Sequence, residues 1–165
     1  MNQLEHSEFI EFLERYKKLV VKIAGVYIKD KDQRDDLIQD IILQLWRAFP
    51  KYNNQQKGST WCYKIALNVT MSFLRRSYKV AKGHEGYARQ HIIDIDADDH
   101  LPEMLNKLYE AMEILNPIDK AIVMLHLEAT PVEESATIIG LSATNFTTRL
   151  HRAKSKLKEH LTQKT

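Results

Sequence analysis

Apolar residues recur at every third or fourth position through most of this chain, and no stretch keeps the alternation of apolar and polar residues that is typical of a β-strand. Residues at this spacing share one face of a helix. The first segment with this pattern contains Phe9, Leu13, Tyr16, Val20, Ile23 and Tyr27, and the second contains Leu37, Ile38, Ile41, Ile42, Leu45, Trp46 and Phe49. The pattern predicts an all-α protein.

Charged and helix-breaking residues predict where the first helices begin and end. The second helix is expected to begin near Asp35 and Asp36, because acidic side chains are favourable at a helix N-terminus, and to stop at Pro50. After a polar loop, a third helix is expected to begin at a cap formed by Ser59 or Thr60 and to end near residue 76.

The last third of the chain predicts a helix-turn-helix. Thr130 and Glu133 have the spacing of a capping box in front of a short helix over residues 132–139. Gly140 suits the left-handed position that ends such a helix, and Ser142 can cap the next one. Two helices joined by a short turn that contains glycine are typical of DNA-binding proteins.

The distribution of charge predicts two domains. The chain has 165 residues, which is enough for one ordinary domain or two small ones. No acid occurs between residues 41 and 84, an acidic segment without Lys or Arg lies between 94 and 103, and the segment from 145 onward is basic again. We expect two small helical domains, at residues 1–80 and 101–165, joined by an acidic flexible linker at 81–100.

Several classes of protein are excluded by what the sequence lacks. A single cysteine, Cys62, excludes a disulfide framework and a cysteine-based zinc site. The histidines have no metal-binding spacing and no catalytic motif occurs, so we expect no metal, no cofactor and no enzymatic activity. No apolar run approaches the roughly 20 residues that a bilayer requires and no secretory signal is visible, which predicts a cytoplasmic protein without membrane insertion.

The predicted last helix has two contrasting faces. One face carries Phe146, Leu150, Ala153 and Leu157 and must be the core face. The opposite face carries hydroxyl groups, an imidazole and a guanidinium without any acid, from Thr144, Thr147, Thr148, His151, Arg152 and Ser155. Such groups reach base edges in a major groove, while Arg149 and Lys154 flank them at the height of the phosphates. The alternative is a solvated face of an ordinary bundle, but the helix-turn-helix pattern favours DNA binding.

A second candidate nucleic-acid surface lies between residues 52 and 76. Basic groups follow a nucleic-acid backbone, and aromatic and amide groups suit unstacked bases. This segment interleaves the three kinds in Tyr52, Asn53, Asn54, Lys57, Trp61, Tyr63, Lys64 and Asn68. The alternative for Trp61 is a plain core position.

Several short motifs follow one another along the chain. The segment Asp35-Asp36-Leu37-Ile38-Gln39-Asp40, followed by Trp46, is similar to a "DLxQ(E/D)" signature, and residues 59–68 are similar to "TWLYRIAxN". Residues 74–76 are similar to "LRR", residues 115–117 to "LxP" and residues 149–153 to "RLHRA". In this order the motifs resemble those of the extracytoplasmic-function (ECF) group of bacterial RNA polymerase sigma factors.

The resemblance implies a non-catalytic subunit that directs RNA polymerase to promoters. It implies contact with core polymerase through Asp36, Leu37, Gln39, Asp40 and Leu43. It implies recognition and opening of the −10 element through Tyr52, Asn53, Lys57, Ser59, Trp61, Lys64, Asn68, Arg75 and Arg76. It implies reading of the duplex −35 element through Thr144, Thr147, Thr148, Arg149, His151 and Arg152, and control by an anti-sigma factor.

Two other functions remain open at this point. A helix-turn-helix regulator that binds duplex DNA as a homodimer would need a ligand-binding or phosphoacceptor domain, and the N-terminal half shows no alternation of strands and helices from which to build one. A DNA-processing enzyme would need clustered carboxylates for metal ions, and the basic segment has none.

Overall fold

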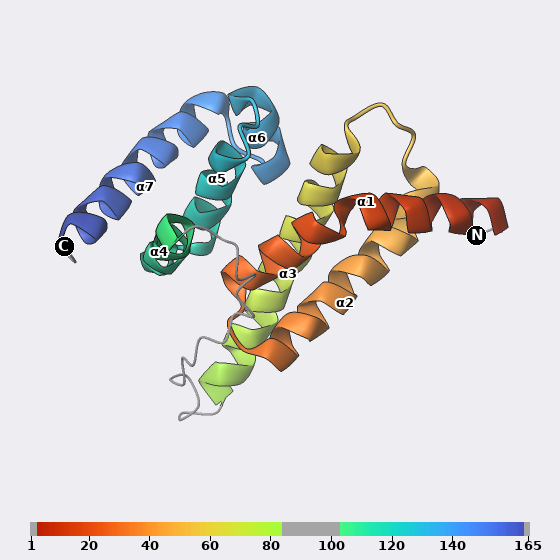
Figure 1. Ribbon diagram of the computed structural model, residues 1–165, viewed down its shortest axis with the longest axis horizontal. Helices are drawn as coiled ribbons and strands as arrows, with labels where there is room; N and C mark the ends of the chain where they lie inside the picture. The colour runs from red at the N-terminus through yellow and green to blue at the C-terminus, as the bar shows by residue number, and fades with distance from the viewer. Residues whose placement is uncertain (1–2, 84–102, 164–165) are drawn as a thin grey trace. The chain divides into compact units, whose positions relative to one another are not determined.

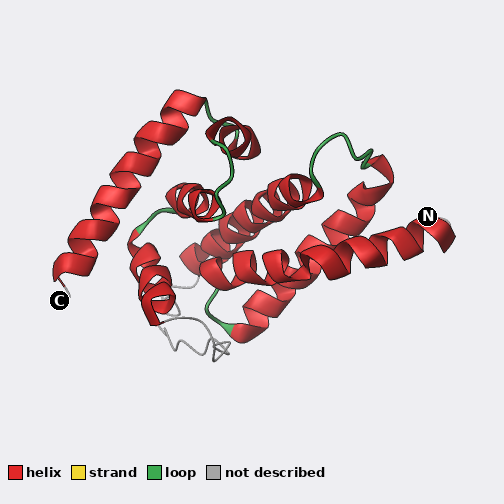
Figure 2. Cartoon of the chain, turned by 45° about the horizontal axis from the view of Figure 1, so that its top comes forward, coloured by secondary structure: helices red, strands yellow, loops and turns green. Residues whose placement is uncertain are grey.

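The computed structural model describes residues 3–83 and 103–163, and every regular element within these ranges is a helix (Figure 2). The chain divides into two compact units. The first contains α1 to α3 and the second contains α4 to α7 (Figure 1). The predicted all-α fold in two helical domains is confirmed, while residues 84–100 of the predicted linker lie outside the described residues.

The first unit is built from three long helices that pack against one another. They are α1 (Gln3–Tyr27), α2 (Lys31–Ala48) and α3 (Gly58–Gly83), with a short 3-10 turn, η1 (Phe49–Lys51), after α2. Each pair of helices is in contact. The core takes its apolar side chains from all three helices: Phe9, Phe12, Val20, Ile23, Leu37, Ile41, Leu45, Cys62, Ala66 and Leu67.

A cluster of aromatic rings anchors the loop between α2 and α3 to α1. The Phe12 ring lies 4.6 Å from Tyr16, 5.5 Å from Phe49, 5.6 Å from Tyr52 and 5.4 Å from Trp61, measured between ring centroids. These separations are those of favourable aromatic pairs. The start of the loop is therefore held at Tyr52.

Two predicted helix starts in this unit are wrong. The α2 helix begins at Lys31 rather than near Asp35, because the Asp30 carboxylate already accepts a hydrogen bond from the Gln33 amide at 2.9 Å. The α3 helix begins at Gly58, so Ser59 and Thr60 lie inside its first turn rather than at its cap. It also continues to Gly83, past the predicted end near residue 76, because no proline or glycine interrupts residues 77–82.

The second unit contains four helices around a largely buried α5. They are α4 (Glu103–Ala111), followed by the 3-10 turn η2 (Met112–Ile114), then α5 (Pro117–Leu127), α6 (Val132–Ile139) and α7 (Ala143–Gln163). The core contains Met112, Leu115, Ile122, Met124, Leu125, Ala136, Ile138, Phe146, Leu150, Ala153 and Leu157. Helices α5, α6 and α7 contact one another in pairs, as a helix-turn-helix and its supporting helix require.

The turn between α6 and α7 is confirmed, and the predicted capping box is not. Gly140 has φ of 81°, in the left-handed region, and the Ser142 hydroxyl accepts a hydrogen bond from the Asn145 amide at 3.1 Å. At the other end of α6 the cap position is taken by Pro131, without a side-chain hydrogen bond. The helix covers the predicted residues, but a capping box would require Thr130 at the cap position, and Thr130 lies one residue outside it.

Candidate nucleic-acid and partner interfaces

The exposed face of α7 has the composition that the sequence predicts. Thr144, Thr147, Thr148, His151, Arg152 and Ser155 are all exposed, and the four residues predicted to face the core are all buried. The helix is fixed at its start by the Ser142 cap and along its length by α5 and α6. This is a rigid helix that presents donors and acceptors without an acid among them, which suits the edges of bases.

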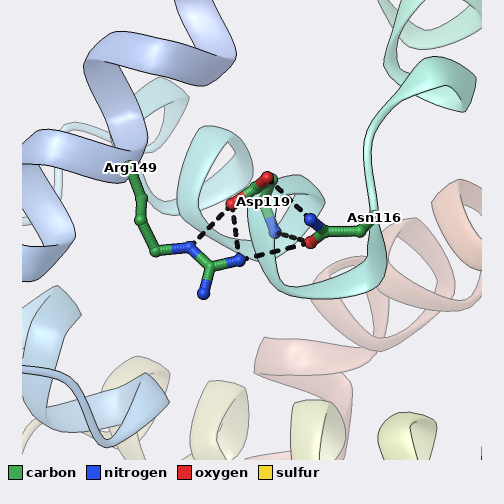
Figure 3. Close-up of polar contacts among 3 residues, drawn as sticks. All are labelled: Asn116, Asp119 and Arg149. Atoms are coloured by element: carbon green, nitrogen blue, oxygen red, sulfur yellow. Dashed lines mark hydrogen bonds and ion pairs between the residues drawn. The ribbon is translucent and has the colours of Figure 1, made fainter.

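Arg149 differs from the other residues predicted to contact duplex DNA, because it is bound within its own unit (Figure 3). Its Nε and Nη2 each lie 2.8 Å from Asp119 Oδ1, and Nη2 also donates to Asn116 Oδ1 at 3.4 Å. Asn116 in turn caps α5: its Oδ1 accepts from the Asp119 amide at 2.9 Å, and its Nδ2 donates to Asp119 Oδ2 at 2.8 Å. Arg149 thus ties the start of α5 to α7.

Sequence reasoning missed Asp119 and Asn116. Both precede or begin an apolar helix, and Asp119 is buried there. A buried carboxylate requires a partner, so an acid within the apolar run was the available signal. The partner itself lies 30 positions further along the chain, and no local pattern identifies it.

The loop between α2 and α3 is internally hydrogen-bonded. The Tyr52 hydroxyl donates to the Gln56 carbonyl at 3.1 Å, and Asn53 Oδ1 accepts from the Gln55 amide at 3.2 Å. Asn54 adopts a left-handed φ of 58°. Burial, and then the neighbouring Tyr16, raise the pKa of Tyr52 above its usual value. The loop therefore has a defined shape before any ligand arrives.

One face of α3 carries exposed polar residues that continue from this loop. Lys64, Asn68 and Arg75 lie at helical spacing and are exposed, as are Asn53 and Lys57 in the loop. Ser59 is partly exposed in the first turn. Trp61 is only 8% exposed and packs 4.7 Å from Tyr52, which favours the core alternative for its ring.

The exposed face of α2 carries the residues predicted to bind polymerase, with one exception. Asp36, Gln39 and Leu43 are exposed, and Asp40 is partly exposed. Leu37 is fully buried, so its side chain supports the helix from the core side and is not available to a partner.

Asp40 also forms an ion pair with Arg76 on α3. Asp40 Oδ2 lies 2.9 Å from Arg76 Nη2. The pair joins a residue predicted to bind polymerase to a residue predicted to bind the −10 element. Both side chains are exposed, at 43% for Asp40 and 65% for Arg76, so the bond contributes at most about 1 kcal/mol to stability.

The described residues contain no group of three or more His, Cys, Asp and Glu side chains that could hold a metal ion. A groove of about 320 Å³ lies beside the aromatic cluster, but Glu5, Glu8 and Glu11 line it, which makes it a poor site for a phosphate backbone. Within residues 3–83 and 103–163 no helix is long and apolar enough to cross a membrane.

Comparison with protein families gives two matches, one in each unit. The family of sigma-70 region 2 matches residues 12–80, and the family of sigma-70 region 4 matches residues 105–157. The two segments fall on α1 to α3 and on α4 to α7.

Characterised relatives align along most of the chain. RNA polymerase sigma factor SigV of Bacillus subtilis is 26% identical over 149 residues, which cover 90% of this chain and 87% of SigV. The RNA polymerase sigma-E factor of Streptomyces avermitilis is 22% identical over 160 residues, which cover 95% of this chain and 87% of that protein.

Solved structures share the fold. The sigma factor RpoE of Bartonella quintana, solved in complex with the anti-sigma factor NepR, superposes with a TM-score of 0.80 at 20% identity, over 94% of this chain and 97% of RpoE. CnrH, solved in complex with the cytosolic domain of CnrY, superposes with a TM-score of 0.69 at 18% identity, over 97% of this chain and 91% of CnrH.

Proposed function

Because the chain belongs to the ECF group of bacterial RNA polymerase sigma factors, we propose that it binds core RNA polymerase, recognises the −10 and −35 elements of promoters and starts transcription. The single observation that carries the proposal is the exposed face of α7 between Thr144 and Ser155, which carries no acid and follows a helix-turn-helix with a left-handed turn at Gly140. The proposal places the protein in the cytoplasm with the polymerase and gives it the role of an initiation factor, with catalysis left to the polymerase.

The −35 element is read, in this proposal, by the N-terminal half of α7. Arg152 contacts a base edge, because a guanidinium pairs well with guanine in the major groove. Thr144, Thr147, Thr148 and His151 line the same exposed face and contribute shorter contacts to bases or phosphates.

The −10 element is bound as a single strand by the loop and the exposed face of α3. Lys57, Lys64 and Arg75 follow the backbone of the strand, and Asn53 and Asn68 contact base edges. Support comes from the loop's internal hydrogen bonds, since a preformed loop loses less entropy when it binds.

Core polymerase binds the exposed face of α2, in this proposal, through Asp36, Gln39, Asp40 and Leu43. Three polar residues beside an exposed leucine suit a basic helical partner with an apolar contact at its centre. We also propose an anti-sigma factor as a regulator, since RpoE and CnrH were each solved as complexes with such a partner or a cytosolic domain.

The experiment that tests the function combines the chain with core polymerase purified from the same bacterium. The chain is expected to co-elute with core and to support transcription from promoters selected out of a genomic or randomised library. A homodimer on duplex DNA, without any dependence on core polymerase, would instead support the regulator alternative.

Two variants test the assigned surfaces. Asn68→Ala is expected to leave duplex binding intact and to reduce promoter opening, as seen by permanganate reactivity. Arg152→Ala is expected to relax preference at one base pair at a cost of about 1–3 kcal/mol. Normal opening by the first variant, or an unchanged preference in the second, would remove the residue from the proposed interface.

A further inference from the structure

Arg149 lies on α7 directly beside the exposed face. Two of its three guanidinium nitrogens, Nε and Nη2, already have partners within the second unit. Nε and Nη2 are both bound to Asp119 Oδ1 at 2.8 Å, and Nη2 reaches Asn116 Oδ1 as well. Asp119 cannot turn away, because its other oxygen accepts from Asn116 Nδ2 at 2.8 Å. Contacts with two acceptor atoms, Asp119 Oδ1 and Asn116 Oδ1, therefore fix the orientation of the guanidinium plane.

The remaining nitrogen of Arg149, Nη1, points away from both partners (Figure 3). The Asp119 side chain is 12% exposed, whereas that of Arg149 is 30% exposed. The pair therefore has a buried acidic end and a more exposed basic end. The two N–H groups of Nη1 on this oriented guanidinium remain available to a ligand.

We propose that Asp119 and Asn116 are positioning residues, which orient Arg149 so that Nη1 donates to a backbone phosphate of the −35 duplex. This inference rests on the proposed function. An arginine on a free helix surface loses rotamer freedom when it binds a phosphate, whereas one whose Nε and Nη2 are already held by a carboxylate oxygen has lost it on folding. The assigned partner is a phosphate rather than a base, because Arg149 lies at the edge of the exposed face.

The direction in which Asp119→Asn changes the affinity for DNA separates this positioning role from an ordinary charge effect. A carboxylate near DNA repels phosphates, so removal of the Asp119 charge should strengthen DNA binding if Asp119 does no more than add negative charge. If Asp119 positions Arg149, Asp119→Asn should weaken binding instead. A matched control is Glu133→Gln, which removes the same charge from an exposed position on α6 and should bind equally or more tightly.

The experiment begins with a randomised 30-bp duplex library, from which the full-length wild-type chain selects its −35 sequence. Binding of the selected duplex is then measured over a range of salt concentrations, at a temperature where melting curves show every variant folded. We expect Asp119→Asn to bind roughly two- to tenfold more weakly, with unchanged base preference. We expect Arg149→Ala to make the plot of log affinity against log salt less steep, reducing the magnitude of its negative slope by about 0.9, the value for one lost phosphate contact.

The double variant gives the decisive comparison. If Asp119 acts through Arg149, the variant with both Asp119→Asn and Arg149→Ala should bind no more weakly than Arg149→Ala alone. Asn116→Ser provides a second route, because serine still caps α5 while the amide contacts to Asp119 and Arg149 are lost. It should weaken binding in the same uniform way, by a smaller factor.

The experiment distinguishes failure of the proposed −35 function from failure of the positioning role. If the wild-type chain selects no sequence, the proposed −35 function is wrong and the positioning role falls with it. If a sequence is selected but Asp119→Asn binds as tightly as wild type or more tightly, the function stands and the positioning role is overturned. An unchanged salt slope in Arg149→Ala also overturns it, because the pair would then only join α5 to α7.

Discussion

Gly58 begins α3 directly beside the ring of Tyr16, where there is no room for a Cβ atom. A Cβ placed on Gly58 would lie 2.6 Å from the Tyr16 hydroxyl oxygen and 2.8 Å from Cε2. The ring cannot simply swing aside, because it packs 4.6 Å from Phe12 in the aromatic cluster. The close approach of the Tyr16 ring to the backbone therefore requires a glycine at position 58. Gly25, in the same unit, is under no such constraint.

We expect Gly58→Ala to destabilise the first unit by about 1–3 kcal/mol, the usual cost of inserting an atom into a packed site. Gly25 on α1 is the control, since a Cβ at that position would meet no atom within 4 Å and alanine should stabilise a helix there by up to about 1 kcal/mol. Urea denaturation measures both. If Gly58→Ala costs as much after Tyr16→Leu as before it, the clash with the ring is not the cause.

Cys62 is fully buried, and burial raises the pKa of its thiol to about 12. In the unfolded chain a thiol ionises near pH about 8.5. Between these values the folded state holds a proton that the unfolded state has lost, so the free energy of unfolding falls as pH rises, by up to about 1.4 kcal/mol per pH unit. Below pH about 8.5 the thiol is protonated in both states, and its contribution to the free energy of unfolding is fully present.

We expect Cys62→Ala to flatten that alkaline decline. Urea denaturation from pH 8 to pH 10.5 should give a steeper loss of stability for wild type than for the variant, whatever their stabilities at pH 8. Parallel curves would show that other groups cause the decline. At neutral pH the native thiol should also react with a thiol reagent only as fast as the first unit opens.

At the scale of helices, the sequence predicts which residues are buried better than where each helix begins. It predicts the buried face of α7 residue by residue, because the periodicity depends only on spacing along one helix. It does not predict the start of α2, since Asp30, Asp32, Asp35 and Asp36 are all acceptable near a helix N-terminus and only the path of the chain out of α1 selects Asp30. Contacts between helices, such as Asp119 with Arg149, depend on tertiary packing and have no local signature.

The ion pair between Asp40 on α2 and Arg76 on α3 offers two variants that together test the polymerase-binding surface. Asp40→Arg is expected to weaken binding of core polymerase strongly, since breaking a desolvated charge pair at an interface costs about 2–5 kcal/mol. The same change places two arginines side by side, so this variant alone does not separate local repulsion from the loss of a partner.

The exchanged variant, Asp40→Arg with Arg76→Asp, resolves this point. It restores an ion pair between α2 and α3 while the charge offered to polymerase stays reversed. We expect its stability to match wild type within about 1 kcal/mol, because the pair is exposed, and its core binding to remain weak. Recovery of core binding in the exchanged variant would show that Asp40 acts by holding Arg76 and not by touching polymerase.

For the whole molecule, the separate cores of the two units predict separate unfolding. Both tryptophans of the chain, Trp46 and Trp61, belong to the first unit. Tryptophan fluorescence therefore follows that unit alone, while far-UV circular dichroism follows the helices of both.

We expect Leu45→Ala in the first core to lower the fluorescence midpoint in urea, by the loss of about 2–5 kcal/mol that is usual for a fully buried leucine. Leu125→Ala in the second core should shift part of the dichroism signal and leave the fluorescence midpoint where it is. An equal shift of the fluorescence midpoint by both variants would show that the units unfold as one.

The bond between Asp40 and Arg76 has a thermodynamic consequence for assembly. Under the proposed function, a polymerase group that takes Asp40 releases Arg76 for the −10 strand, and by reciprocity a strand that takes Arg76 releases Asp40. Polymerase and promoter then favour each other's binding through this chain alone. The strength of an exposed ion pair sets the ceiling, about 1 kcal/mol or roughly fivefold, so Arg76→Ala should remove at most that much cooperativity from promoter binding by the holoenzyme.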